Sequence, residues 1–118
     1  MGYEIGERDE RPWGTWEVLG VGAGHAVKRI VVRPGMRLSL QRHAHRAERW
    51  VVVSGEGQVT KGEQIVPVQA GDVVAIGVGD LHRIANTGAS DLTFVEVQLG
   101  DRLEEADIER VADDHGRV

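Results

Sequence analysis

Short valine-rich segments alternate with turn-forming residues along almost the whole chain, and this rhythm limits the possible folds more than any other feature. Val31-Val32, Val51-Val52-Val53 and Val73-Val74-Ala75-Ile76 are apolar runs too short for core helices, and β-branched residues favour strands. Turn clusters separate such runs at intervals of roughly ten residues, a spacing typical of sandwiches and barrels. Sixteen glycines against three prolines supply the turns. We therefore predict an all-β domain.

The predicted strands lie where apolar residues stand between two turn clusters. They cover residues 13–18, 26–33, 38–44, 48–54, 58–61, 64–68, 73–76, 81–85 and 92–99. Residues 1–10 are polar, and we predict an N-terminal arm there, followed by one domain over residues 11–118. After Asp101 the pattern changes to one that resembles a capping box followed by a narrow apolar stripe. A short C-terminal helix is predicted in this segment.

The composition excludes several classes of protein. A chain of 118 residues provides one core and one domain. Cysteine is absent, so any transition metal must be bound by histidine, carboxylate or amide oxygen. The formal charge of −5 argues against nucleic acid as a partner, and no apolar run approaches the roughly 20 residues of a membrane-spanning helix. The acidic N-terminus lacks the apolar stretch of a secretory signal, so we expect a cytoplasmic protein.

Three histidines and a glutamate are spaced to form one divalent-metal site. His43, His45 and Glu48 lie close together, and His82 lies in the second half of the chain. Strand-like alternation projects Gln41, His43 and His45 to one side, and a turn lets Glu48 face the same way. Imidazoles with one carboxylate suit Zn, Mn, Co, Ni or Fe and leave coordination positions open. The sequence thus predicts a bound divalent metal ion.

The segments that carry these residues resemble the two motifs of the cupin superfamily. The motif positions are Gly35, His43, Glu48 and Gly55 in the first segment, and Gly71, Gly79, His82 and Asn86 in the second. The resemblance implies a double-stranded β-helix, the jelly-roll-like barrel of cupins. Counting back from Glu48, the usual ligand pair of the motif falls on Gln41 and His43, with His45 one step further on. The implied metal ligands are therefore His43, Glu48 and His82, with Gln41 or His45 as the fourth.

The Gln-x-His-x-His form of the first motif resembles a narrower group, the type II phosphomannose isomerases. Further segments match that group in order, at residues 11–18, 27–30, 34–41, 43–48, 50–55, 96–98 and 107–110. In this group the isomerase domain is often fused behind a mannose-1-phosphate guanylyltransferase. The resemblance implies metal-dependent isomerisation of mannose 6-phosphate to fructose 6-phosphate through a cis-enediolate. Arg49 departs from the group, which usually has a histidine at this position.

Basic residues near the motifs suit an anionic substrate such as a phosphosugar. Lys28, Arg37 and Arg46 are the candidates, because ammonium and guanidinium groups bind phosphate oxygens. Alternation along the strand places Arg37 on the same side as Gln41, whereas Arg46 is a candidate because of its position in the family motif. Gln98 belongs to a polar stripe that alternates with apolar residues, and such a stripe inside a small barrel usually marks a binding cavity.

The reaction also needs a base near the sugar C–H bond. Candidates are Glu96, from the same polar stripe as Gln98, and whichever of His45 and Glu48 is not bound to metal. Together with Arg46, these are the predicted catalytic residues.

Two other functions stay open at this point. Arg49 would be the mark of a non-catalytic cupin that binds a sugar or sugar phosphate. The same ligand set with Fe would also serve a small dioxygenase. Because exposed strand edges invite pairing, and the segment from Trp13 to Val18 is a natural strand to donate, a homodimer is predicted as well.

Overall fold

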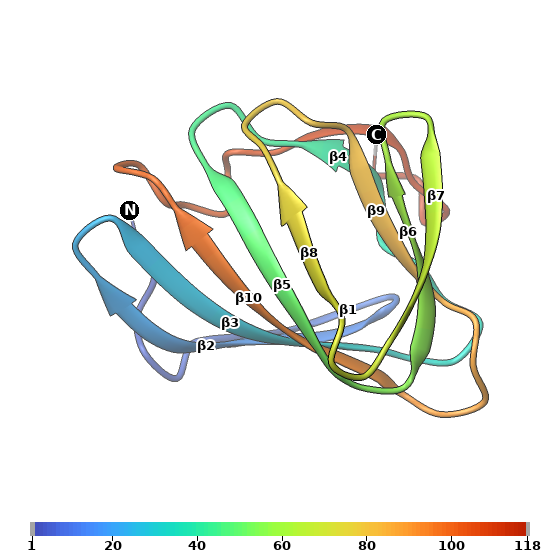
Figure 1. The fold of residues 1–118 in the computed structure, drawn as a ribbon. Coiled ribbons are helices and arrows are strands. Elements are labelled where there is room, and N and C mark those ends of the chain that lie inside the picture. The colour runs from blue at the N-terminus through green and yellow to red at the C-terminus, as the bar shows by residue number, and fades with distance from the viewer. Residues whose placement is uncertain (1, 118) are drawn as a thin grey trace.

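Eleven strands build residues 2–117, the part of the chain that the computed structural model describes (Figure 1). The strands are β1 (Arg8–Arg11), β2 (Gly14–Gly22), β3 (His25–Val32), β4 (Leu40–Arg42), β5 (Ala47–Ser54), β6 (Glu56–Lys61), β7 (Gln64–Gln69), β8 (Val73–Ile76), β9 (His82–Asn86), β10 (Leu92–Leu99) and β11 (Glu109–Ala112). They form two antiparallel sheets, in the orders β1-β2-β3-β10-β5-β8 and β11-β4-β9-β6-β7. The predicted all-β barrel is confirmed, and each predicted strand overlaps one of these elements.

The interior changes from apolar to polar along the strands. In β10, Leu92, Phe94, Glu96 and Gln98 are buried in turn while the residues between them are partly exposed. Phe94 packs on Trp50 of β5, with ring centroids 5.0 Å apart, within the apolar core. The last two inward residues of β10 are polar, so one end of the barrel interior is a core and the other is a candidate site.

Gly55, the last glycine of the first motif, holds the tight turn between β5 and β6. Its φ is +89°, and a Cβ there would lie 2.6 Å from the carbonyl oxygen of Asp91. Only glycine fits such a position without strain. The two sheets can therefore approach closely where the chain passes from one to the other.

The predicted C-terminal helix is wrong, because residues 109–112 form strand β11 instead. Residues 2–117 contain no helix, and hence none long and apolar enough to cross a membrane. Strand β11 pairs with the short strand β4, and the Nε of Arg42 donates to the Glu109 carboxylate at 2.7 Å. Before it, the Asp107 carboxylate accepts the backbone N–H groups of Ala44 and His45, each at 2.9 Å. These long-range bonds outweigh a weak local helix pattern.

The N-terminal segment, predicted to be a polar arm, contributes to the barrel. Strand β1 pairs with β2 in antiparallel register, and Tyr3 is buried with 8% of its surface exposed. Strand β2 is paired on its other edge with β3. The strand expected to be donated to a partner is thus paired on both edges within its own chain, and the homodimer stays a prediction without this support.

Candidate metal centre and interior cavity

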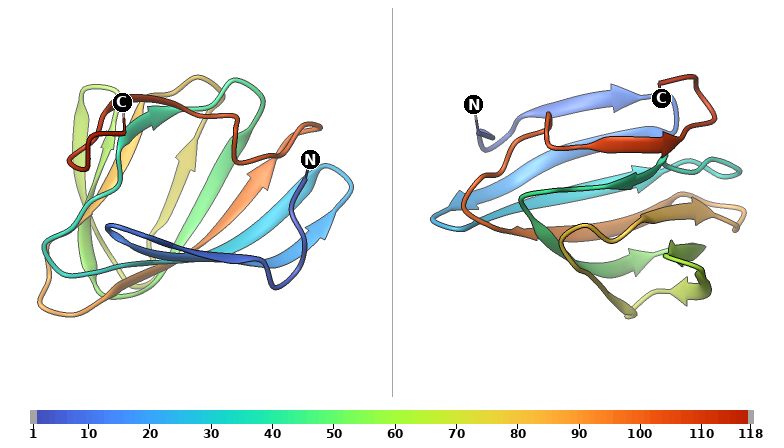
Figure 2. Two further views of the ribbon diagram at one scale, coloured as in Figure 1. Left: turned by 180° about the vertical axis from the view of Figure 1, so that it is seen from behind. Right: turned by 90° about the horizontal axis from the view of Figure 1, so that it is seen from above.

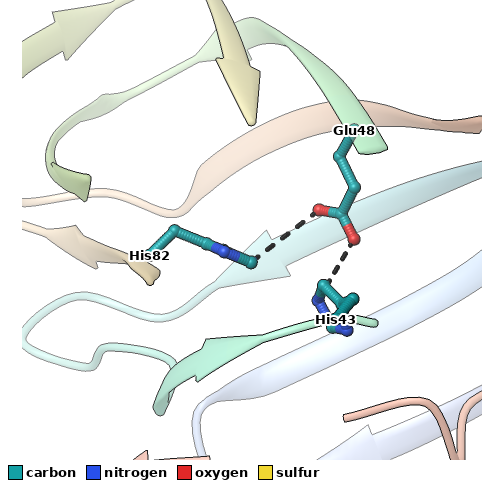
Figure 3. A group of neighbouring side chains, drawn as sticks. All are labelled: His43, Glu48 and His82. Carbon is teal, nitrogen blue, oxygen red and sulfur yellow. Dashed lines mark ion pairs between the residues drawn. The ribbon is translucent and has the colours of Figure 1, made fainter. Parts of the chain in front are cut away.

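Three buried side chains from different elements meet at the polar end of the barrel (Figure 3). His43 follows β4, Glu48 lies on β5 and His82 begins β9. His43 Nε2 lies 3.3 Å from one Glu48 oxygen, and His82 Nε2 lies 4.0 Å from the other. None of the three exposes more than 3% of its surface. The structure therefore brings the predicted core ligands together.

Hydrogen bonds orient both imidazole rings toward the carboxylate. His43 Nδ1 lies 2.6 Å from the carbonyl oxygen of Asp107, and His82 Nδ1 lies 2.9 Å from that of Asp80. A carbonyl can only accept, so each Nδ1 carries the proton and each Nε2 presents its lone pair to Glu48. Histidines that bind metals are commonly held this way.

The electrostatics of the group fit a cation between the three residues. Burial, and then the charge of Arg46, lowers the pKa of His43 to about 4, and burial also lowers the pKa of His82. Both rings are therefore neutral near pH 7, and their lone pairs face a carboxylate. Neutral imidazoles and a carboxylate, with ligand atoms all within 4.8 Å of one another, are the donors that a divalent transition metal requires.

Arg46 lies beside this group as a buried cation. Its Nε donates to Glu48 at 2.8 Å, and its Nη2 lies 3.4 Å from His43 Nε2. Burial disfavours its charged form, but the carboxylates of Glu48 and Glu96 outweigh burial and raise its pKa. The guanidinium therefore stays charged inside the barrel.

Glu96 and Gln98 line the interior, as predicted from their alternation. Burial, and then the neighbouring Glu48, raises the pKa of Glu96 to about 7. The Gln98 side-chain nitrogen donates to Glu96 at 2.8 Å. Lys28 is also buried, but its ammonium is paired with the half-buried Glu105 at 2.6 Å. The site thus holds a carboxyl group that titrates near neutrality.

Strands β1 to β3 lie on one side of the barrel, and β4 lies on the other with the C-terminal segment that contains β11 (Figure 2, left). Residues from both sides line a cavity that Arg46 and Glu96 also line. Gln41, Arg46, Lys28 and Glu96 are among the side chains that line it. Gln41 is half-buried, and its side-chain nitrogen donates to Ser39 Oγ at 2.9 Å.

The other predicted site residues lie elsewhere. His45 is exposed, and its ring is 3.5 Å from Arg102. Arg37 is exposed as well, and it binds the Asp114 carboxylate through two hydrogen bonds of 2.7 and 2.9 Å. Arg49 projects from the outer face of β5, opposite to its neighbour Glu48. A histidine at position 49 would therefore point away from the candidate metal centre.

Sequence reasoning missed several residues that complete the site. The Tyr3 hydroxyl donates to Glu105 at 2.6 Å and lies 3.4 Å from Arg46 Nη1. Asp107 positions His43 through its carbonyl oxygen. Asp107 lies in residues 107–110, one of the segments that match the isomerase group, but the capping-box pattern after Asp101 predicts a helix there.

Comparisons with known proteins identify sequence relatives over nearly the whole chain. The family model described as Mannose-6-phosphate isomerase C-terminal matches residues 3–113. Xanthan biosynthesis protein XanB from Xanthomonas campestris is 46% identical over 108 residues, which are 92% of this chain and 23% of that protein. Alginate biosynthesis protein AlgA from Pseudomonas aeruginosa is 46% identical over 108 residues, 92% of this chain and 22% of that protein. A mannose-1-phosphate guanylyltransferase from Escherichia coli is 44% identical, again over 92% of this chain and 23% of that protein. The chain therefore spans less than a quarter of the length of these relatives.

Solved structures share the fold. A protein with a double-stranded β-helix domain from Klebsiella pneumoniae superposes with a TM-score of 0.71 at 23% identity, covering 95% of this chain and 90% of the other. Oxalate decarboxylase from Lactobacillus farciminis gives a TM-score of 0.78 at 22% identity, covering 89% of this chain and 33% of the other. The predicted double-stranded β-helix is thereby confirmed.

Proposed function

Because this chain belongs to the family of mannose-6-phosphate isomerase C-terminal domains, we propose that it interconverts mannose 6-phosphate and fructose 6-phosphate with a divalent metal held by His43, Glu48 and His82. The observation that carries the proposal is a titratable carboxyl group, Glu96, buried beside the candidate ligands and lining the cavity. Isomerisation of an aldose to a ketose moves a proton between C1 and C2. A metal ion bound at this site would supply the Lewis acid that polarises the sugar carbonyl.

Glu96 is the proposed base. A general base works best when its pKa lies near the working pH, and the pKa of Glu96 is raised to about 7. Gln98, which donates to one Glu96 oxygen at 2.8 Å, holds the carboxyl group in place. Glu96 can then accept the proton from one carbon and return it to the next.

The other candidates for the base fit less well. His45 is exposed and is not among the residues that line the cavity. Both oxygens of Glu48 are engaged, one by the indole N–H of Trp50 at 2.9 Å and one by Arg46 at 2.8 Å. A carboxylate that accepts two such bonds and faces two imidazole lone pairs is better suited to bind a metal than to carry a proton.

The test is an isomerase assay on protein stripped of metal and reloaded with Zn, Mn, Co, Ni or Fe in turn. Glu96→Gln keeps the shape of the side chain and removes its basicity, so we expect it to bind metal normally and to lose about 10²- to 10⁴-fold in turnover. Glu48→Gln should lose both metal and turnover. Glu63→Gln, at an exposed turn between β6 and β7, is the control and should match the wild type.

Each result decides between the candidate functions. Turnover by a loaded wild type, lost in Glu96→Gln, supports the isomerase with Glu96 as base. If Glu96→Gln keeps the turnover of the wild type, the protein is an isomerase whose base is another residue. A loaded wild type that binds mannose 6-phosphate and never converts it is a sugar-phosphate-binding domain, and the isomerase proposal is then wrong.

A further inference from the structure

The cavity is basic, although the chain as a whole carries a formal charge of −5. Its lining includes two carboxylates, Glu96 and Glu105, and more than twice as many basic side chains. The basic residues are Arg11, Lys28, Arg46, Arg110 and Arg117. Lys28 and Arg46 are buried, and the three other arginines are partly buried. A charge withdrawn from water is costly unless an anion accompanies it. The cavity is therefore matched to an anionic ligand.

Three of these residues are arginines that lie apart from the candidate metal ligands: Arg11, Arg110 and Arg117. Arg11 ends strand β1 on one side of the cavity, while Arg110 on β11 and Arg117 beyond it come from the other. Arg117 is already neutralised, because Asp113 accepts two hydrogen bonds from its guanidinium, at 2.9 and 3.0 Å. Arg11 also has carboxylates nearby, with Asp9 at 3.3 Å and Glu105 at 4.0 Å. Arg110 is thus the member of the three without an ion pair among residues 2–117.

Strand register places Arg110 on the inner face of the barrel. Arg110 pairs with Gln41, and Gln41 pairs with His82, so the three residues form one row across β11, β4 and β9. Residues paired in this way point to the same side of a sheet. Arg110 is thus two strands, or roughly 10 Å, from the backbone of a candidate metal ligand.

Arg110 lacks a carboxylate partner of the kind that the exposed Arg29 and Arg37 possess. Its buried Nε has no hydrogen-bond partner among residues 2–117. Burial, and then the like charges of Arg117 and Arg11, lowers its pKa. By contrast, Arg29 is paired with Glu17 at 3.2 Å and Arg37 with Asp114 at 2.7 Å.

A second unpaired donor lies in the same cavity. Trp16, 4% exposed, lines the cavity, and its indole Nε1 has no hydrogen-bond partner within the described chain. The guanidinium carbon of Arg11 lies 6.0 Å from the centre of the Trp16 ring. Buried donors without acceptors cost free energy, which a ligand rich in acceptor oxygens would recover.

We propose that Arg110, with Arg11 across the cavity from it, binds the phosphate group of the substrate. That the phosphate belongs to a sugar phosphate rests on the proposed function; that the site binds phosphate does not. An open-chain hexose 6-phosphate carries its phosphate at the opposite end from C1 and C2. A phosphate bound to Arg110 would therefore leave C1 and C2 free to reach Glu96, which lines the same cavity. Lys28 is not part of this subsite, because Glu105 already neutralises it.

The test uses inorganic phosphate titrated into metal-free protein by calorimetry, which depends on neither the metal nor turnover. Arg110→Met keeps an apolar stem and removes the charge, and we expect it to weaken phosphate binding by about 10- to 100-fold. Arg110→Lys keeps the charge without the guanidinium fork, so its affinity for phosphate should lie between those of the wild type and Arg110→Met. Arg29→Met, on the outer face, is the matched control and should bind like the wild type.

Thermal melting separates binding from folding. Removal of an unpaired, partly buried charge should leave the Tm of Arg110→Met equal to that of the wild type or above it. In metal-loaded protein, Arg110→Met should weaken the binding of mannose 6-phosphate by the same factor. The affinity for free mannose should not change. Equal affinity of wild type and Arg110→Met for inorganic phosphate would overturn the subsite, even if the isomerase is active. If Arg110→Met weakens phosphate binding as expected but the wild type shows no turnover, the phosphate subsite stands and only the proposed isomerase activity is overturned.

Discussion

Replacing His82 by alanine should abolish the stabilisation that a divalent metal confers, whereas replacing His45 should not affect it. His82 presents its Nε2 to Glu48 from a buried position, and the two other close ligands, His43 and Glu48, cannot replace it. His45 is exposed, so its loss should leave the ligand group intact. The pair of variants tests which histidines bind the metal.

The magnitude follows from linkage. A metal at one hundred times its dissociation constant adds about 2.7 kcal/mol to the free energy of unfolding. Unfolding entropy is about 2.1 cal/mol/K per residue, so a chain of 118 residues gains roughly 0.25 kcal/mol/K on unfolding. Dividing the two terms predicts a metal-induced rise in Tm of about 11 °C.

The assay is differential scanning calorimetry of each protein with and without metal. We expect a rise of about 11 °C for the wild type and for His45→Ala, and none for His82→Ala. Metal-free His82→Ala should also melt below metal-free wild type, because it leaves a buried cavity. A full metal-induced rise in His82→Ala, or its loss in His45→Ala, would refute the assignment of ligands. Gln41→Ala then decides whether the amide of Gln41 completes the set, since it should reduce the rise without abolishing it.

Further outcomes follow from the same geometry. Arg49→His should leave isomerase turnover within a factor of about 2 in the coupled assay, because position 49 lies on the outer face of β5. Asp107→Asn should lower the free energy of unfolding in urea by about 1–3 kcal/mol, because an amide nitrogen then faces a backbone N–H donor. Metal-free protein should lose stability as the pH falls from 6.5 toward about 4, as urea titrations would show. The pKa of His43 is about 4 when folded and ordinarily 6.5, so protons bind the unfolded chain first.

Much of the barrel could be predicted from the sequence, because alternation and turn residues act locally. Strand β10 is an example, since its period of two gave the inward positions of Glu96 and Gln98 correctly. The family resemblance is confirmed by the match of residues 3–113. It was also enough to select His43, Glu48 and His82 from five histidines and nineteen acidic residues.

The parts that could not be predicted depend on distant partners. Strand β11 exists because Glu109 and Arg110 pair with β4, nearly seventy residues away, and nothing in the local sequence signals that pairing. A regular strand over residues 38–44 would place Arg37 on the same side as Gln41. The structure begins β4 only at Leu40, and Arg37 forms just an isolated bridge to Ala85. Alternation holds only while the chain stays extended and paired.

The bond between Tyr3 and Glu105 has a consequence for motion. Chain ends usually exchange their amide hydrogens fastest, because they open with little loss of packing. Here the Glu105 carboxylate accepts from Tyr3 at 2.6 Å and from Lys28 of β3 at 2.6 Å. The segment that contains Tyr3 and the segment that contains Glu105 are therefore joined to each other and to the barrel. We therefore expect residues 2–7 and 101–108 to open as one cooperative unit, with equal protection factors in hydrogen exchange. Ligand entry to the interior would then depend on the same opening equilibrium.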